Sequence, residues 1–174
     1  MKLTMTFLLG LATVASAIEI RFYGNNGCSG RFNSCWNVNP NQCCNQAEMN
    51  SISFEFIPSN WRITVKGYDQ NACNRQKAQL NTVGQTRMCI GGDAPYTGGG
   101  YNFYGRKRDD DHSNVEAAPS SECLRPDIFA DEDGVEYSAQ SLNDDEFEKL
   151  VALWYNGTSV SDVVSTFSSF TLKE

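Results

Sequence analysis

The stretch RFYGNNGCSGRF, residues 21–32, and the later stretch VKGYDQNACNRQ, residues 65–76, share one arrangement of residues. In both, a tyrosine precedes a cysteine by five positions, at Tyr23 and Cys28 and again at Tyr68 and Cys73. Apolar and polar residues alternate before each tyrosine, which is typical of a half-buried strand, and the residues after it favour a turn. We therefore predict two β-hairpins, each with a tyrosine at the bend and a cysteine where the chain turns back.

Each predicted hairpin is followed by a further apolar strand. SISFEF, residues 51–56, follows the first and places Ile52, Phe54 and Phe56 on one face, while TRMCI, residues 86–90, follows the second. The pattern of a hairpin, an irregular connection and a returning strand thus occurs twice in the sequence. It predicts two Greek keys. Two such units pack face to face, so we expect a mainly β fold, a small Greek-key β-sandwich.

Residues 18–92, about 75 of the 174 residues, resemble the beta/gamma-crystallin family. The family signature is an aromatic residue, four residues, a second aromatic, any residue and then glycine. Tyr23, Cys28 and Gly30 occupy these spacings, with cysteine in place of the second aromatic. The second copy has Arg75 in place of the glycine, whereas Asn50-Ser51-Ile52 and Trp61 are similar to the family pattern. The resemblance implies that fold, with disulfides replacing part of its aromatic packing.

Cysteines are numerous for a chain of this length, and we interpret them as a covalent framework. The disulfide candidates are Cys28, Cys35, Cys43, Cys44, Cys73 and Cys89, with Cys123 as the odd cysteine. Zinc needs paired Cys-x2-Cys spacings or histidines, and the chain has only His112. Six cysteines permit 15 pairings, so the connectivity stays open. Small secreted domains commonly need such staples because their cores are small.

The first seventeen residues, MKLTMTFLLGLATVASA, predict a signal peptide cleaved before Ile18. Their apolar run is too short to span a bilayer, and no later apolar segment approaches twenty residues. We therefore expect a secreted, extracellular protein with no transmembrane anchor. Its odd cysteine allows either a monomer or a disulfide-linked dimer.

Charge divides the chain into two parts. Residues 18–108 carry a net charge of +5 and residues 109–174 carry −13, and the sign changes where Arg106-Lys107-Arg108 meets three aspartates. Because glycine, proline and serine are frequent on both sides, we place a flexible linker at residues 93–122, between a β domain at 18–92 and an acidic segment at 123–174. Lys107 and Arg108 form either a dibasic processing site or an ordinary solvated charge cluster.

The acidic segment is predicted to hold a short hairpin and one clear helix. IFADEDGVEY bends at Asp133-Gly134, and SLNDDEFEKLVALWYNG has a capping pair, Asn143 and Glu146, before its apolar face. A second, weaker helix is expected over residues 160–167. A segment of this size must dock on the β domain, dimerise or fold on a partner. Asn156 begins the sequence Asn-Gly-Thr, a glycosylation acceptor.

Catalytic and metal-binding patterns are weak throughout the sequence. His112 is the only histidine and lies in the charged linker, where a general base would lack a fixed position. Calcium-binding members of the crystallin family carry paired oxygen ligands before the fourth strand, but residues 46–51 and 81–86 do not supply them. We therefore expect no enzyme activity, no metal and no cofactor.

Basic and aromatic residues of the first part suit a polysaccharide of the cell wall or an anionic surface, and give no signature of specific nucleic-acid binding. The predicted ligand surface comprises Arg62, Lys66, Arg75, Lys77, Arg87, Tyr96, Tyr101 and Tyr104. Several microbial secreted proteins of crystallin-like fold are killer toxins, and the chain resembles a fungal secreted effector or antimicrobial protein. The resemblance implies a non-enzymatic, toxin-like binder; the alternative is a structural or cell-wall-associated protein, and an extracellular hydrolase ranks third.

Overall fold

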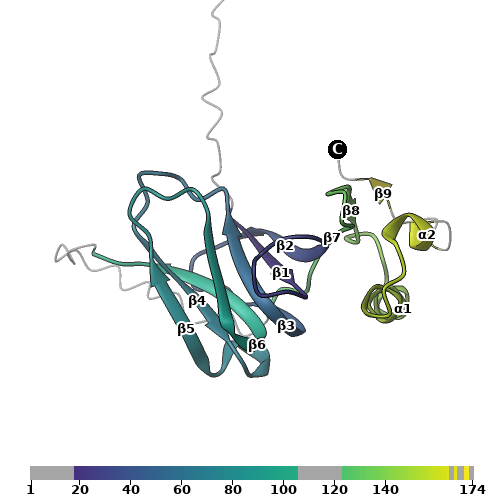
Figure 1. Cartoon of the computed structure of the whole chain (residues 1–174), viewed down its shortest axis with the longest axis horizontal. Coiled ribbons are helices and arrows are strands. Elements are labelled where there is room, and N and C mark those ends of the chain that lie inside the picture. Colours follow the sequence, from purple (N-terminus) through teal and green to yellow (C-terminus); the bar gives the residue numbers. More distant parts are fainter. Residues whose placement is uncertain (1–17, 106–122, 165–166, 168–170, 173–174) are drawn as a thin grey trace, which may run out of the picture.

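The computed structural model describes residues 18–105, 123–164, 167 and 171–172 (Figure 1). The predicted signal peptide, the Lys107-Arg108 site and His112 lie outside the described residues. The elements are β1 (Ile18–Tyr23), β2 (Phe32–Val38), β3 (Cys44–Glu55), β4 (Ile63–Tyr68), the 3-10 turn η1 (Asn71–Cys73), β5 (Gln76–Asn81), β6 (Met88–Phe103), β7 (Ile128–Ala130), β8 (Glu136–Ser138), α1 (Asp144–Tyr155), α2 (Val160–Val164) and β9 (Thr171–Leu172). The mainly β prediction is confirmed.

All nine strands belong to one sheet, in the order β5-β4-β6-β3-β1-β2-β7-β8-β9. Its first six strands are two copies of one unit, because β1 and β2 form a hairpin followed by β3, and β4 and β5 form a hairpin followed by β6. Both predicted hairpins are thus confirmed. The third strands, β3 and β6, pair with each other in antiparallel fashion at the centre, and each also pairs with the first strand of its own unit.

The bend of the first hairpin is held by local side-chain hydrogen bonds. Asn25 Oδ1 accepts a hydrogen bond of 2.9 Å from the amide of Gly27, which is the turn chemistry that asparagine favours. Ser51 of β3 closes the turn, since its Oγ accepts from the amide of Cys28 and donates to the carbonyl of Asn25. Gly30 adopts a φ of 79°, a conformation that is open to glycine and costly for most other residues.

Three disulfides cross-link the β domain, which confirms the disulfide prediction. Cys28, in the first repeated stretch, bonds Cys89 near the start of β6, the third strand of the second unit. Cys73, in the second repeated stretch, bonds Cys43, which directly precedes the third strand of the first unit. The repeated cysteines therefore cross-link the two units reciprocally. Cys35 and Cys44 form the third bond, and Cys123 is free.

The long strands β3 and β6 pair irregularly. Their register shifts between Asn45 and Ser51, and β6 pairs with β3 from Met88 to Gly99 and with β4 from Gly98 to Phe103. A Cβ added at Gly99 of β6 would lie 2.8 Å from Cγ2 of Ile20 in β1, so these two strands approach each other closely. The main core consists largely of buried apolar side chains, which include Ile18, Ile20, Phe22, Ile52, Phe54, Ile63, Val65, Tyr96 and Tyr101.

The acidic segment docks on the β domain and extends its sheet. β7 pairs with β2, and Leu124 forms a bridge to Cys44, so this segment is not separate from the residues before it. The predicted hairpin is present as β7 and β8. The predicted capping box is also present at the start of α1, where Asn143 accepts from the amide of Glu146 and Glu146 accepts in return. Figure 1 shows α1 and α2 beside β7–β9, on the side away from β4 and β5.

Two expectations are wrong. The flexible linker was expected from residue 93, but β6 continues to Phe103 and lies inside the sheet, between β4 and β3. Glycines 98–100 permit this because they allow neighbouring backbone and side chains to approach closely. Phe56 was expected on the face of Ile52 and Phe54, yet it is 56% exposed. The strand ends at Glu55, and a φ of 59° at Phe56 breaks the alternation of faces. The second predicted helix is present as α2, and residues 165–166 of the range predicted for it lie outside the described residues.

Candidate functional site

The predicted ligand surface does not form one patch. Tyr96 and Tyr101 were expected on it, but both are buried in the core, because the strand that carries them is central rather than part of a linker. Arg75 and Arg87 are exposed, yet the first is ion-paired with Asp69 and the second with Glu55. Lys66 and Lys77 are half-buried, on β4 and β5 respectively.

The structure brings two pairs of these residues together: Lys77 Nζ lies 5.6 Å from the centroid of the buried Tyr96 ring, and Arg62 lies next to Tyr104. β4 and β6 pair in a register that sets Ile63 opposite Phe103, so the residues just before β4 and just after β6 are neighbours. The amide of Tyr104 donates a hydrogen bond of 3.1 Å to the carbonyl of Arg62. The Tyr104 hydroxyl donates to the carbonyl of Thr82 at 2.7 Å, which fixes its ring.

These residues border a cleft of about 300 Å³, which we call the aromatic cleft. It is lined by Asn60, Trp61, Arg62, Phe103, Tyr104 and Gly105. The rings of Trp61 and Phe103 meet edge to face with their centroids 4.8 Å apart, and Trp61 also lies 6.3 Å from the buried ring of Tyr101. The aromatic cleft therefore has rigid walls that rest on the core, while the side chains of Trp61, Phe103 and Tyr104 stay partly exposed.

The chemistry of the aromatic cleft is that of a binding site. Aromatic rings offer flat apolar faces, and Arg62 offers up to five N–H donors. Within the part of the chain that the structure describes, Arg62 is exposed and has no carboxylate within ion-pair distance. The six lining residues include no carboxylate, histidine or thiol. Such a surface can hold an uncharged ring or an anion.

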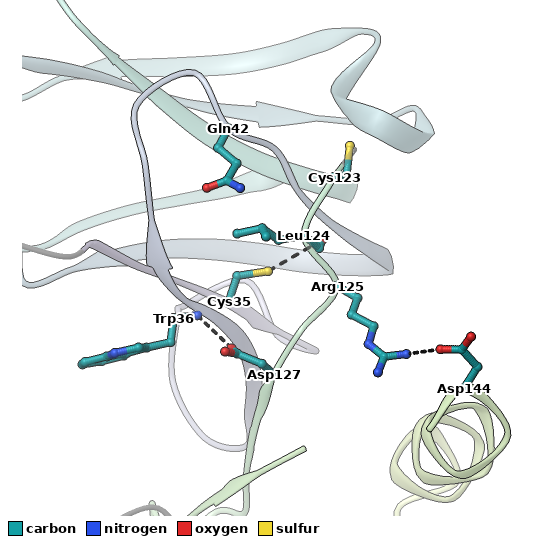
Figure 2. Close-up of a pocket in the computed structure, with 8 residues that line it drawn as sticks. All are labelled: Cys35, Trp36, Gln42, Cys123, Leu124, Arg125, Asp127 and Asp144. Atoms are coloured by element: carbon teal, nitrogen blue, oxygen red, sulfur yellow. Dashed lines mark hydrogen bonds and ion pairs between the residues drawn. The ribbon is translucent and has the colours of Figure 1, made fainter. Parts of the chain in front are cut away.

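A larger cleft, of about 650 Å³, lies where the acidic segment meets the β domain (Figure 2). Its walls comprise Cys35, Trp36, Gln42, Cys123, Leu124, Arg125, Asp127 and Asp144. This cleft is not predictable from the sequence, because it depends on how two segments about ninety residues apart come together. Burial raises the pKa of the Cys123 thiol, which makes the thiolate scarcer near neutral pH.

The charged groups of this larger cleft already have protein partners. Asp127 accepts from the amide of Trp36 at 2.8 Å and from the side chain of Gln140 at 2.7 Å. Arg125 is ion-paired with Asp144 at 2.7 Å and donates to the carbonyl of Leu142 at 2.9 Å. The hydrogen bond between Trp36 and Asp127 joins the acidic segment to the β domain, and the other contacts lie within the acidic segment. We therefore interpret the larger cleft as a structural contact region and not as a binding site.

The remaining predictions concern glycosylation, metal binding and membrane insertion. Asn156 is exposed at the C-terminal cap of α1, so its glycosylation stays a prediction. Among the described residues, no group of three or more histidine, cysteine, aspartate or glutamate side chains is arranged to hold a metal ion. Neither described helix is long and apolar enough to cross a membrane.

Comparison with known proteins gives one match. No curated protein and no solved structure matches the chain. The sequence pattern of the ARB_05566_N family, which is described as an N-terminal domain, matches residues 19–127, more than half of the chain. The match begins in β1, includes both repeated units and ends just before β7, so it also crosses the region expected to be a linker. The chain therefore belongs to the ARB_05566_N family of N-terminal domains.

Proposed function

We propose that this protein is a secreted, non-enzymatic effector of toxin-like character that binds a cell-wall polysaccharide through the aromatic cleft. The observation that carries the proposal is the position of the exposed Arg62 beside the partly exposed rings of Trp61, Phe103 and Tyr104. The apolar faces of sugar rings pack on aromatic side chains, while guanidinium and amide groups bind hydroxyls, and binding sites commonly combine these two features.

Secretion is supported by the three disulfides, because such bonds persist in oxidising compartments. Action by binding rather than turnover is supported by the cleft's lining, which has a cation and aromatic rings but no acid, base or nucleophile pair. A polysaccharide also suits the open shape of the aromatic cleft, since a polymer needs a surface that its chain can cross.

The test is retention of the full secreted chain on insoluble chitin and β-glucan. We expect retention on at least one polymer, and a loss of about tenfold or more in affinity for Trp61→Ala and for Arg62→Ala, as is typical of tryptophan and arginine at the centre of a binding surface. Trp36→Ala is the matched control, because Trp36 is also a partly exposed tryptophan but lies outside the aromatic cleft. Thermal unfolding of each variant separates lost binding from lost folding.

Three outcomes would contradict parts of the proposal. Retention that survives both cleft substitutions would exclude the aromatic cleft as the site. Release of soluble sugar from either polymer would identify a hydrolase instead of a binder. The purified protein is also applied to microbial and plant cells: injury at micromolar dose supports an effector or toxin, whereas retention without injury would favour a structural wall protein.

We also propose that the two repeated units form a Greek-key sandwich of the beta/gamma-crystallin kind. It is supported by the reciprocal disulfides, by the facing of Gly99 and Ile20, and by Ser51, which bonds the hairpin turn from the position expected in that family. An experimental structure tests it: superposition of β1–β3 on β4–β6 should place Tyr23 on Tyr68. Unrelated surroundings for the two tyrosines would exclude the resemblance.

A further inference from the structure

A third cleft, of about 240 Å³, lies between the first hairpin turn, β3 and the end of α1, and we call it the Arg31 cleft. Gly24 and Arg31 come from the hairpin, Met49 and Asn50 from β3, and Trp154 and Tyr155 from α1. It is separate from the aromatic cleft, with which it shares no lining residue. An inference about it is therefore independent of the proposed function.

Arg31 and Trp154 form a stacked pair in the wall of this cleft. The Cζ atom of Arg31 lies 4.6 Å from the centroid of the Trp154 ring, a cation–π contact. The Nη2 atom of Arg31 donates to the carbonyls of Trp154 at 2.8 Å and Thr158 at 3.2 Å, near the end of α1. The stacking contact and these hydrogen bonds hold the guanidinium in one orientation, which also fixes the direction of its other N–H groups.

Two donors of this pair have no acceptor among the described residues. Trp154 is 4% exposed, and its indole Nε1 makes no hydrogen bond. The Nε atom of Arg31 is also buried and makes none. A buried donor without an acceptor is costly, and native proteins almost always provide a partner from protein, water or ligand. Both nitrogens belong to residues that line the Arg31 cleft but have almost no accessible surface, so an oxygen acceptor in the cleft would satisfy them after a small movement of these two side chains.

The charges around Arg31 favour an acceptor with one negative charge. In the described part of the chain, no carboxylate lies within ion-pair distance of Arg31. Asp131 and Glu132 are near enough to raise its pKa, but burial has the larger, opposite effect, so the cation gains from a closer anion. Glu48 also lines the cleft and is exposed, and together with these two acids it would repel a doubly charged phosphate or sulfate.

The remaining wall of the cleft is apolar. Met49 is buried, and the ring of Tyr155 meets that of Trp154 edge to face with centroids 5.4 Å apart. Flat aromatic walls and a thioether favour a ring over a straight polar chain. We propose that the Arg31 cleft is a binding site for a small ring compound that carries a single carboxylate, with Arg31 and the indole N–H of Trp154 as its donors.

The test records the three tryptophan indole N–H signals of the full ¹⁵N-labelled chain by NMR, with Trp36→Phe and Trp61→Phe variants to identify the signal of Trp154. The probes are benzoate and D-galacturonate, which distinguish an aromatic acid from a sugar acid, and their uncharged counterparts are benzyl alcohol and galactose. We expect a saturable shift of the Trp154 signal with at least one acid. Arg31→Gln should weaken that binding by about tenfold or more, since hydrogen bonds to charged groups contribute about 1.5–3 kcal/mol.

Arg31→Lys keeps the positive charge but lacks the Nε donor, so it should also bind more weakly. Lys66→Gln, which removes a charge on β4 outside the cleft, should bind as the unaltered chain does. Unchanged signals of Trp36 and Trp61 report that each variant is folded. If both Arg31 variants unfold, the comparison of each acid with its uncharged counterpart on the unaltered chain decides the question.

The proposal fails if neither acid shifts the Trp154 signal, because the two donors would then be satisfied by ordered water only. It fails equally if the uncharged compounds shift that signal with the same affinity as the acids, or if Lys66→Gln weakens binding as much as Arg31→Gln does. Equal affinity for the uncharged compounds would indicate an apolar pocket without carboxylate recognition. An equal effect of Lys66→Gln would indicate attraction by overall charge.

Discussion

Arg21 of β1 donates a hydrogen bond from Nη2 to Oε1 of Glu136 in β8 at 2.9 Å, although 115 residues separate the two in sequence. The same Nη2 atom lies 2.7 Å from the carboxylate of Glu19, which is fully buried. Ser34 donates a further hydrogen bond to Glu19. One cation therefore neutralises a buried acid within the first hairpin and also connects the acidic segment to it.

Loss of Arg21 should be much more harmful than loss of Glu136. Arg21→Met keeps an apolar side chain but removes the guanidinium, whose Cζ lies 4.2 Å from the centroid of the Phe32 ring. It leaves Glu19 buried and unneutralised, so we expect a fall of about 3 kcal/mol or more in the free energy of unfolding. Glu136→Gln leaves the pair of Glu19 and Arg21 intact and should cost about 1 kcal/mol or less. Urea unfolding, followed by tryptophan fluorescence, measures both.

Adding Glu19→Gln to Arg21→Met provides the control, because it removes the unneutralised charge. The double variant should regain a large part of the lost stability. A double variant that is less stable than Arg21→Met would mean that the loss arises from packing around the arginine stem and not from the buried charge.

The disulfide between Cys28 and Cys89, which joins the two units, should stabilise the protein more than the short disulfide between Cys35 and Cys44. The bond between Cys28 and Cys89 closes 61 residues, and the bond between Cys35 and Cys44 closes 9. Chain entropy gives about 4 kcal/mol for the first and about 2.5 kcal/mol for the second. Paired alanine substitutions at each bond, made in a Cys123→Ala chain that cannot exchange disulfides, should show this order in urea. The reverse order would mean that packing around the buried Cys35 and Cys44 outweighs loop closure.

Much of the fold follows from local patterns in the sequence. The alternation in residues 18–23 predicts β1, the repeated tyrosine and cysteine predict two hairpins, and Asn143 with Glu146 predicts the start of α1. These signals are local, because a strand face, a turn and a helix cap each depend on a few neighbouring residues.

The site depends on pairing between distant strands, which the sequence does not show. The run of glycines at 98–100 resembles a linker in composition, yet it lies inside the sheet, between β4 and β3, because the missing side chains let other parts of the chain approach. That error placed Tyr96 and Tyr101 on the surface. Trp61 and Phe103 meet only because β4 and β6 pair in one register. Of the six residues that line the aromatic cleft, the sequence therefore predicted only Arg62 and Tyr104 as ligand-binding residues.

Gly99 provides a direct test of the close approach of β6 to β1. A Cβ there would lie 2.8 Å from Cγ2 of Ile20 and 3.4 Å from Cγ2 of Ile52, both in the core. Gly99→Ala should therefore destabilise the protein by about 1–3 kcal/mol, the usual cost of overpacking. Gly24→Ala is the matched control, because a Cβ at that position would meet nothing within 4 Å. Equal melting temperatures for the two variants would contradict the close approach of β6 to β1.

Tyr101 predicts how stability depends on alkaline pH. Its buried hydroxyl donates to the carbonyl of Val38 at 3.0 Å, and burial raises the pKa of Tyr101 above its ordinary value. The folded state thus keeps this proton more strongly than the unfolded chain does, so the stabilising effect is complete below the unfolded pKa of about 10 and is lost as the pH rises beyond it. Stability should fall between pH 9 and pH 11, which are about one unit either side of that value.

Tyr101→Phe isolates this contribution. At pH 7 the variant should be less stable by about 1 kcal/mol, because the carbonyl of Val38 loses its donor. Between pH 9 and pH 11, about one unit either side of the unfolded pKa, its stability should fall less steeply than that of the unaltered chain. Urea unfolding at a series of pH values, with Cys123→Ala in both proteins to prevent disulfide exchange, gives the two slopes. Parallel slopes would mean that Tyr101 ionises as readily in the folded protein as in the unfolded chain, and the buried hydrogen bond to Val38 would then have no part in alkaline unfolding.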